Sequence, residues 1–245
     1  MSTEGSKRAV VAAMLANLGI AIAKFIGFLF TRSSSLLAES IHSVADTGNQ
    51  VLLLLGGRRS KRRADRLHPF GYGRERFFWA FVVSIVLFTL GSLFAIYEGI
   101  EKVLHPHEID SPQWAIGILA VSILLEANSF RTAVVAARPA KVGSSWYSFI
   151  RHSRSPELPV VILEDTGALL GLVLAMGAVI IAVITDNGVW DGVGSITIGA
   201  LLGVIAIVLS VEMKSLLIGE SATETDEHRI RRAIEASPSV NTLIS

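Results

Sequence analysis

Cysteine is absent from all 245 residues, so the chain has neither disulfides nor thiolate metal ligands. Any metal that it binds must be held by nitrogen and oxygen atoms. Two further signatures are missing. No His-Glu-x-x-His sequence occurs, which argues against a zinc hydrolase, and the glycine-rich stretch 71–73 lacks the Lys-Ser/Thr ending of a phosphate-binding loop. Catalytic hydrolysis and nucleotide binding are therefore not expected.

Charge is scarce in six apolar segments, each near the roughly 20 residues that cross about 30 Å of hydrocarbon. The chain is 51% hydrophobic with a mean hydropathy of +0.55, which predicts an all-α membrane protein. The first segment has no small-residue cleavage site before it or within it, so we expect it to be retained as a span. The six predicted spans are Ala9–Phe30, Leu36–Gly57, Phe77–Gly99, Trp114–Val135, Leu158–Thr185 and Val189–Val211.

Basic residues gather on one side of these spans, although the net charge is only +1. They precede the first span, fill the second-to-third and fourth-to-fifth connections and follow the sixth span, whereas the other side carries only Arg32 and Lys102. The positive-inside rule therefore predicts six spans with both termini in the cytoplasm. The absence of a targeting peptide favours a bacterial inner (plasma) membrane, with an organelle membrane as the alternative.

The second span is more polar than its length requires. His42 and Asp46 lie one helical turn apart and share a face with Asn49 and Gln50. An ionisable side chain inside a membrane costs roughly 2.5–3.5 kcal/mol on insertion scales and usually marks a site or a pathway. Two such residues in register on one helix predict a site for a metal ion or a proton.

The fifth span adds two adjacent carboxylates, Glu164 and Asp165. Neighbouring helical residues point about 100° apart, so both cannot aim equally at one ion. We take Asp165 as the ligand. Glu164 is a further candidate ligand, with proton relay or contact with a neighbouring helix as alternatives. The predicted metal residues are thus His42, Asp46, Asp165 and Glu164.

Three other polar residues leave alternatives open. Lys24, in the first span, is expected either to extend to the outer interface or to pair with Glu39, and a role in gating is the sharper alternative. Glu126, in the fourth span, either bonds helices together or lines a cavity. His68, in the basic connection, is a candidate second metal contact or a solvated loop residue.

The end of the chain changes character. Residues 1–218 are predicted to form the transmembrane domain, and residues 219–245 to begin a cytoplasmic C-terminal domain. A charged amphipathic helix is expected over Thr225–Ile234, followed by a turn that enters a strand over Pro238–Ile244. A single strand is not stable alone, so we expect the rest of an α/β domain to lie outside these residues.

Taken together, these motifs resemble the cation diffusion facilitator family of divalent-metal/proton antiporters. Within it, the chain is similar to the zinc transporter branch that contains mitochondrial zinc transporter 9. The resemblance covers essentially the whole chain. The motifs are His42-Ser43-x-x-Asp46, His68-Pro69-Phe70-Gly71-Tyr72-Gly73-Arg74-x-Arg76, Ile162-Leu163-Glu164-Asp165-Thr166, Asp191-Gly192-x-Gly194-Ser195-x-x-x-Gly199, Leu217-x-Gly219-Glu220-Ser221 and Pro238-Ser239-Val240.

The resemblance implies a six-helix bundle, a cytoplasmic ferredoxin-like domain, homodimerisation and a transport site with two ligands from each of two helices. His42, Asp46 and Asp165 fall on that pattern, whereas Val161 occupies the fourth position. A three-ligand site, closed by Glu164 or by water, is the expected consequence. Tyr72 stands where a second histidine of a subsidiary site near His68 would be, so that site is expected to be absent.

The expected function is export of Zn²⁺ from the cytoplasm in exchange for protons, by alternating access and without enzymatic activity. An imidazole ligand suits Zn²⁺, while Mn²⁺, Fe²⁺, Co²⁺ and Cd²⁺ remain alternatives. A metal-binding membrane scaffold that does not transport is the alternative from another class. The expected partners are the lipid bilayer, the cation, protons and a second copy of the chain, and no nucleic acid.

Overall fold

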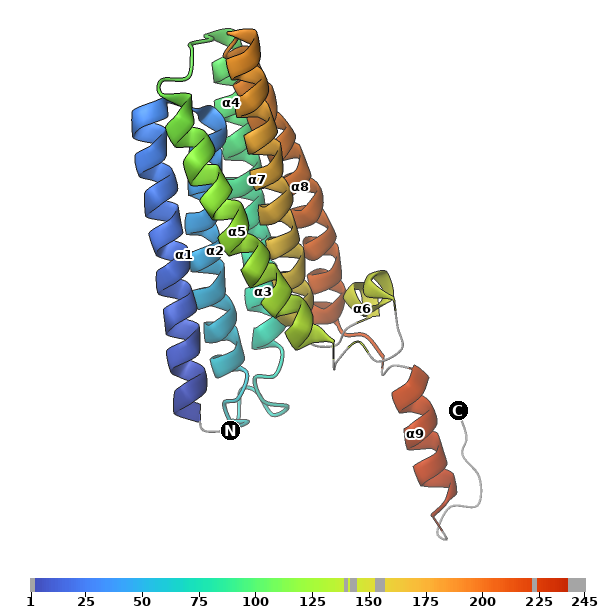
Figure 1. Cartoon of the computed structure of the whole chain (residues 1–245). Coiled ribbons are helices and arrows are strands. Elements are labelled where there is room, and N and C mark those ends of the chain that lie inside the picture. Colours follow the sequence, from blue (N-terminus) through green and yellow to red (C-terminus); the bar gives the residue numbers. More distant parts are fainter. Residues whose placement is uncertain (1–2, 139–140, 142–144, 153–156, 222–223, 238–245) are drawn as a thin grey trace.

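The computed structural model describes residues 3–138, 141, 145–152, 157–221 and 224–237, and every regular element in these residues is a helix. Six long rods lie side by side in one bundle (Figure 1). They are α1 (Thr3–Thr31), α2 (Ser34–Arg59), the continuous rod α3 (Glu75–Val86), η1 (Leu87–Leu93) and α4 (Phe94–Leu104), then α5 (Pro112–Ala137), α7 (Glu157–Thr185) and α8 (Val189–Ile218).

All six predicted spans fall within these rods, which confirms the all-α fold. The α3–η1–α4 rod, α5, α7 and α8 are each long and apolar enough to cross a membrane. Helix α1 contributes a shorter apolar stretch, Asn17–Thr31. Helix α2 is less apolar because its polar residues lie on one side, where neighbouring helices cover them. Large apolar side chains such as Leu29, Leu124 and Ile184 are exposed on the outside of the bundle, as a lipid-facing surface requires.

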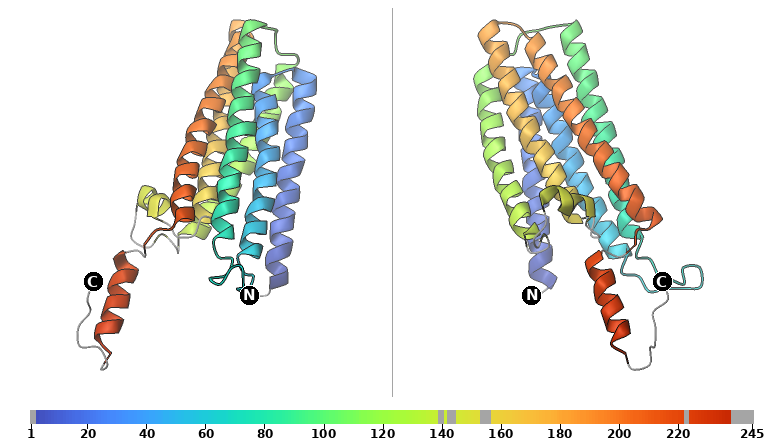
Figure 2. Two further views of the ribbon diagram at one scale, coloured as in Figure 1. Left: turned by 180° about the vertical axis from the view of Figure 1, so that it is seen from behind. Right: turned by 90° about the vertical axis from the view of Figure 1, so that its right-hand side faces the viewer.

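The ends of the bundle differ in charge. The α2–α3 connection, α6 (Trp146–His152) and α9 (Glu224–Glu235) lie at the same end as the N-terminus (Figure 2). We call this the basic end and the opposite one the outer end. The predicted grouping of basic connections on one side is therefore confirmed, whereas its assignment to the cytoplasm stays a prediction from the positive-inside rule.

The C-terminal prediction is only partly tested. Helix α9 covers the predicted amphipathic helix and projects away from the bundle (Figure 1). The strand expected over Pro238–Ile244 lies outside the described residues. The α/β domain and the domain boundaries therefore remain predictions.

Glycines bring α4 and α8 into backbone contact. A Cβ atom on Gly99 would lie 2.6 Å from the carbonyl oxygen of Gly192, and one on Gly199 would lie 2.8 Å from the carbonyl oxygen of Ser92 in η1. These separations are too short for any larger residue, so the small side chains are needed for the close approach. Gly203, one turn after Gly199, also packs closely, because a Cβ atom there would lie 2.7 Å from Oγ of Ser92, whereas Ala200 is exposed.

The third rod contains an irregularity that the sequence analysis did not predict. Residues Leu87–Leu93 form a π-helical segment between two α-helices. Such segments are rare and often occur at functional sites. Gly91 lies within it, and a Cβ atom there would be 3.7 Å from Nδ1 of His42. The irregular turn is therefore at the same depth as the predicted site.

Candidate metal site

The predicted site lies in the middle of the bundle, where α2 packs against α7. His42 is fully buried, and its Nε2 atom is 3.5 Å from Oδ2 of Asp46 one turn further along α2. The two side chains share one face of the helix, as their spacing predicted.

A small cavity of about 20 Å³ adjoins this pair, with room for a single water molecule or ion. Asp46 reaches it from α2, Glu126 from α5, and Glu164 and Asp165 from α7. For Glu126, the structure thus favours the cavity-lining alternative. The other lining residues are Asn17, Ile20, Ser43, Gln50 and Val161.

The four predicted ligands are brought to one region but are not drawn together around one point. Three of them line the cavity, whereas His42 lies beside it and contacts only Asp46 among the four. In the described residues, no group of three or more His, Asp or Glu side chains is arranged to hold an ion. The complete ligand set therefore remains a prediction.

Glu164 and Val161 line the same cavity. Val161 occupies the position at which the family resemblance implies a fourth ligand. Glu164 is 5% exposed, and the side-chain amide of Asn49 donates a hydrogen bond to its Oε1 atom. Asn49 is thus a supporting residue that sequence reasoning placed on the polar face of α2 without assigning it a partner.

Unpaired polar atoms distinguish this region. Six buried side-chain atoms among the described residues have no hydrogen-bond partner, and all belong to α2 or α7. A buried polar group without a partner costs about 1–3 kcal/mol. Oxygen and imidazole nitrogen atoms are the donor types that this cysteine-free chain can offer a metal. The atoms are Oε1 of Glu39, Nδ1 and Nε2 of His42, Oδ1 of Asp46, Oδ1 of Asn49 and Oδ2 of Asp165.

Lys24 lies on the outer side of this site. Its Nζ atom is 3.1 Å from Oε2 of Glu39 and donates a 2.8 Å hydrogen bond to Oγ of Ser43. Its side chain is only 1% exposed. The expected pairing with Glu39 is confirmed, and the alternative of an extended, interface-seeking side chain is wrong.

A second polar network closes the outer end. The buried Asp191 carboxylate at the start of α8 accepts hydrogen bonds from Oγ of Ser33 (2.8 Å) and from the backbone N–H groups of Ser34 (2.7 Å) and Ser35 (3.2 Å). It thereby satisfies donors at the N-terminus of α2 that have no partner within the helix. Sequence reasoning noted Asp191 only within a motif, although the serine run before α2 is a helix-start signal.

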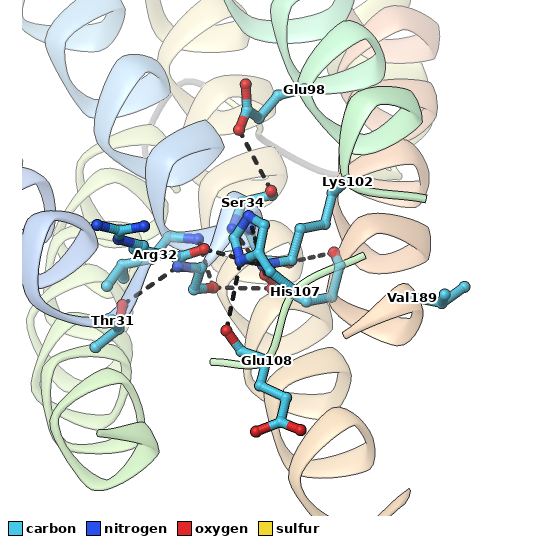
Figure 3. A network of polar contacts seen from close by, with 12 residues as sticks. Thr31, Arg32, Ser34, Glu98, Lys102, His107, Glu108 and Val189 are labelled. Atoms are coloured by element: carbon cyan, nitrogen blue, oxygen red, sulfur yellow. Dashed lines mark hydrogen bonds and ion pairs between the residues drawn. The ribbon is translucent and has the colours of Figure 1, made fainter. Parts of the chain in front are cut away.

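Lys102 completes this outer network from α4. Its Nζ atom lies 3.9 Å from Oδ2 of Asp191 and donates hydrogen bonds to the carbonyl oxygen of Arg32 and to the ring of His107. Figure 3 shows Lys102 extending toward His107, while the Ser34 hydroxyl points toward Glu98. The network thus ties α2, α4, α8 and the connection after α4 together. We call it the outer clasp.

His68 is held within its own loop at the basic end. The Asp65 carboxylate accepts a hydrogen bond from the Tyr72 hydroxyl (2.6 Å) and one from the backbone N–H of His68 (2.7 Å). These bonds lower the pKa of Asp65 to about 2, and the carboxylate raises the pKa of Tyr72. Because the rings of His68 and Tyr72 also pack 4.4 Å apart, the contacts support a structural role for this histidine.

Comparison with known proteins agrees with this picture. The chain is 33% identical to the mitochondrial proton-coupled zinc antiporter SLC30A9 of Mus musculus over 242 residues, which cover 98% of this chain and 43% of that protein. It is 32% identical to metal tolerance protein C4 of Arabidopsis thaliana over 99% of this chain and 54% of that protein. It is 27% identical to the zinc transporter ZitB of Pectobacterium atrosepticum over 81% of this chain and 57% of that protein.

The chain thus spans about half the length of these relatives or less. Residues 10–218 match the cation efflux transmembrane domain, a domain of transporters rather than enzymes. This match covers five of the six rods completely and most of α1. The chain is therefore a multi-pass membrane protein of the cation diffusion facilitator family.

Proposed function

We propose that this chain forms the membrane part of an antiporter that exports Zn²⁺ from the cytoplasm in exchange for protons. The observation that carries the proposal is the cavity shared by Asp46, Glu164 and Asp165, with His42 beside it. The unpaired oxygen and nitrogen atoms that could bind a metal lie on two helices, α2 and α7. Proteins similar to this chain are named as zinc antiporters and a zinc transporter.

Zinc is proposed first because one imidazole and several carboxylates match its preference for nitrogen and oxygen ligands when sulfur is absent. Fe²⁺ and Co²⁺ accept similar ligands, and a set dominated by oxygen atoms would also serve Mn²⁺. Cd²⁺ remains a further alternative. In the bound state, movement of His42 toward the cavity would bring its Nε2 atom to the cation with Asp46 and Asp165, while Glu164 supplies the ligand that Val161 cannot.

Proton coupling follows from the same ligands. A carboxylate or imidazole must be deprotonated to bind a metal, so protons and the metal compete for the same lone pairs. The metal would enter from the basic end, reach the cavity past Gln50, which lies one turn beyond Asp46 toward that end, and bind between α2 and α7. Rearrangement of the bundle would then expose the site to the outer side, where protons displace the metal.

The membrane and the assembly are also proposals. SLC30A9 is named as mitochondrial, which supports the organelle alternative over the bacterial inner membrane. A homodimer is proposed from the family resemblance alone, and cross-linking in native membranes would test it.

Reconstitution of the full-length protein into liposomes tests the function. A zinc dye and a pH dye, both enclosed, should report zinc uptake accompanied by proton release, and His42→Ala should abolish both signals. His68→Ala is the matched control and should transport normally, because that histidine is bound within its own loop. Zinc movement without proton counterflow would refute antiport.

A metal-binding scaffold that does not transport is the second candidate, favoured by Val161 at a ligand position. Calorimetric titration separates it from the antiporter. Saturable zinc binding that depends on His42, with no flux of either ion in the liposomes, would support the scaffold.

A further inference from the structure

The ion pair between Lys24 and Glu39 lies across the predicted exit from the metal site. Helix α2 runs from the outer end to the basic end, so Glu39 comes one turn before His42 on the outer side. The cavity, in contrast, is lined on α2 only by Ser43 and later residues. Glu39 and the cavity therefore lie on opposite sides of His42 along α2, and Lys24 spans the distance from Glu39 to Ser43 at the cavity wall.

The space between α2 and α7 at Glu39 is closed by close packing as well as by the ion pair. A Cβ atom on Gly171 of α7 would lie only 2.5 Å from Oε1 of Glu39. Leu172 of α7 and Ile198 of α8 are fully buried in the apolar core of the same bundle. Because α7 backbone abuts the carboxylate directly, an ion could not pass between α2 and α7 here unless the Glu39 side chain moved.

The pair is also incompletely satisfied, unlike the outer clasp. Oε1 of Glu39 has no hydrogen-bond partner although it is buried, and Oε2 depends on Lys24. Two buried charges recover their loss of hydration only when their remaining polar atoms are also bonded. The pair is therefore less firmly held than its burial suggests, and movement of the ammonium group would leave a free carboxylate one turn from His42.

We propose that the Lys24–Glu39 ion pair is the outward gate of the metal site. In the closed state the ammonium group of Lys24 holds Glu39 between α2 and α7 and is anchored to Ser43 at the cavity wall. The gate opens when the ammonium group leaves Glu39, and the freed carboxylate then offers the departing cation its next oxygen ligands. This inference rests on the proposed direction of transport from the basic end to the outer end.

Accessibility of an introduced thiol tests the gate, because this chain has no cysteine of its own. Ala168 is buried on α7, one turn from Gly171 toward the basic end, and therefore lies on the cavity side of the ion pair. In the full-length protein with any other cysteine replaced, Ala168→Cys should react slowly with a membrane-impermeant maleimide applied from the outer side. Adding Lys24→Met or Glu39→Gln should raise the labelling rate about tenfold, because either change shifts the population toward the open gate.

Two further variants make the result specific to the pair. The exchange Lys24→Glu with Glu39→Lys should restore slow labelling. Lys102→Met, which removes the buried lysine of the outer clasp, should leave the labelling rate of Ala168→Cys unchanged in the fraction that elutes as folded protein. Glu39→Gln is nearly isosteric and keeps the test available if Lys24→Met does not fold.

The gate is overturned if the Lys24→Met and Glu39→Gln proteins that carry Ala168→Cys are folded and label as slowly as Ala168→Cys alone. It is also overturned if Lys102→Met raises labelling equally, since that result would indicate general loosening. Zinc titration on the same proteins keeps this outcome separate from the proposed function. Lys24→Met should still bind zinc. If no protein binds zinc, the parent included, the proposed function is contradicted. The labelling rates decide the gate in either case.

Discussion

Among the described residues, Lys24 and Lys102 are both buried, and each serves a polar network of a different kind. In the outer clasp, Lys102 and Asp191 use several hydrogen bonds each, and neither contributes an unpaired atom. Around the metal site, Glu39, His42, Asp46, Asn49 and Asp165 all keep at least one buried atom without a partner. Complete pairing is what a structural junction needs, whereas unpaired donors and acceptors are what a ligand can use. We therefore expect loss of the outer clasp to reduce stability and loss of the second network to reduce binding.

The largest expected effect is on stability, at the clasp. Asp191→Ala leaves Lys102 buried without its counter-charge and removes the acceptor for the N-terminus of α2. We expect the free energy of unfolding to fall by roughly 3–5 kcal/mol, as for other buried pairs that lose one partner. Denaturant unfolding in detergent micelles, followed by circular dichroism, measures this loss.

Glu108→Ala is the control for this change, because its carboxylate points away from the clasp (Figure 3). It should leave the unfolding free energy unchanged. Equal destabilisation by both variants would remove the structural role given to Asp191.

The next effect is on binding. His42→Ala should reduce zinc affinity by about 100-fold, the upper end of what loss of a residue that only supports a metal site costs. Its effect on the unfolding free energy should be smaller than that of Asp191→Ala, because the imidazole has no hydrogen-bond partner to lose. Calorimetric zinc titration measures the change in affinity, and denaturant unfolding measures the change in stability. A variant that binds zinc like the parent would exclude His42 from the site.

A finer comparison concerns the two acids of α7. Asp165→Asn should lower zinc affinity about tenfold, as loss of a carboxylate charge from the cavity weakens metal binding. Glu164→Gln should have the smaller effect, because one Glu164 oxygen is already engaged by Asn49, whereas Oδ2 of Asp165 is free. Parallel titrations of the two variants measure the order, and the reverse order would make Glu164 the principal acid.

The smallest effect is expected at the surface of the outer end. Arg32 and Asp110 form an ion pair of 3.9 Å with side chains 72% and 66% exposed. Such pairs contribute about 0–1 kcal/mol because water and salt screen them. Asp110→Ala should therefore change the unfolding free energy within that range. A loss as large as that of Asp191→Ala would show that exposure does not distinguish this surface pair from the buried outer clasp.

Patterns of residue type predicted the parts of this molecule that depend on one helix at a time. Apolar length located the six rods, and helical spacing placed His42 and Asp46 on one face. The pairing of Lys24 with Glu39 could be anticipated because two opposite charges in neighbouring spans need each other in a membrane.

Features that depend on how helices approach one another could not be predicted in this way. The hydrogen bond from Asn49 to Glu164 joins residues 115 positions apart, and the bond from Ser34 to Asp191 joins residues 157 positions apart. Their partners are set by packing, which one sequence does not specify. The π-helical turn around Gly91 likewise has no periodic signature, because one altered turn barely changes an apolar pattern.

The contact between Gly99 and Gly192 restricts how the bundle can change shape. Where side chains separate two helices, rotamer changes can absorb a sliding motion, but here main chain rests on main chain. We therefore expect helices α4 and α8 to move together over this stretch. A rearrangement that alternates access to the site would then move α4 and α8 as a pair against the remaining helices. The sliding would occur at helix contacts that are made by side chains alone.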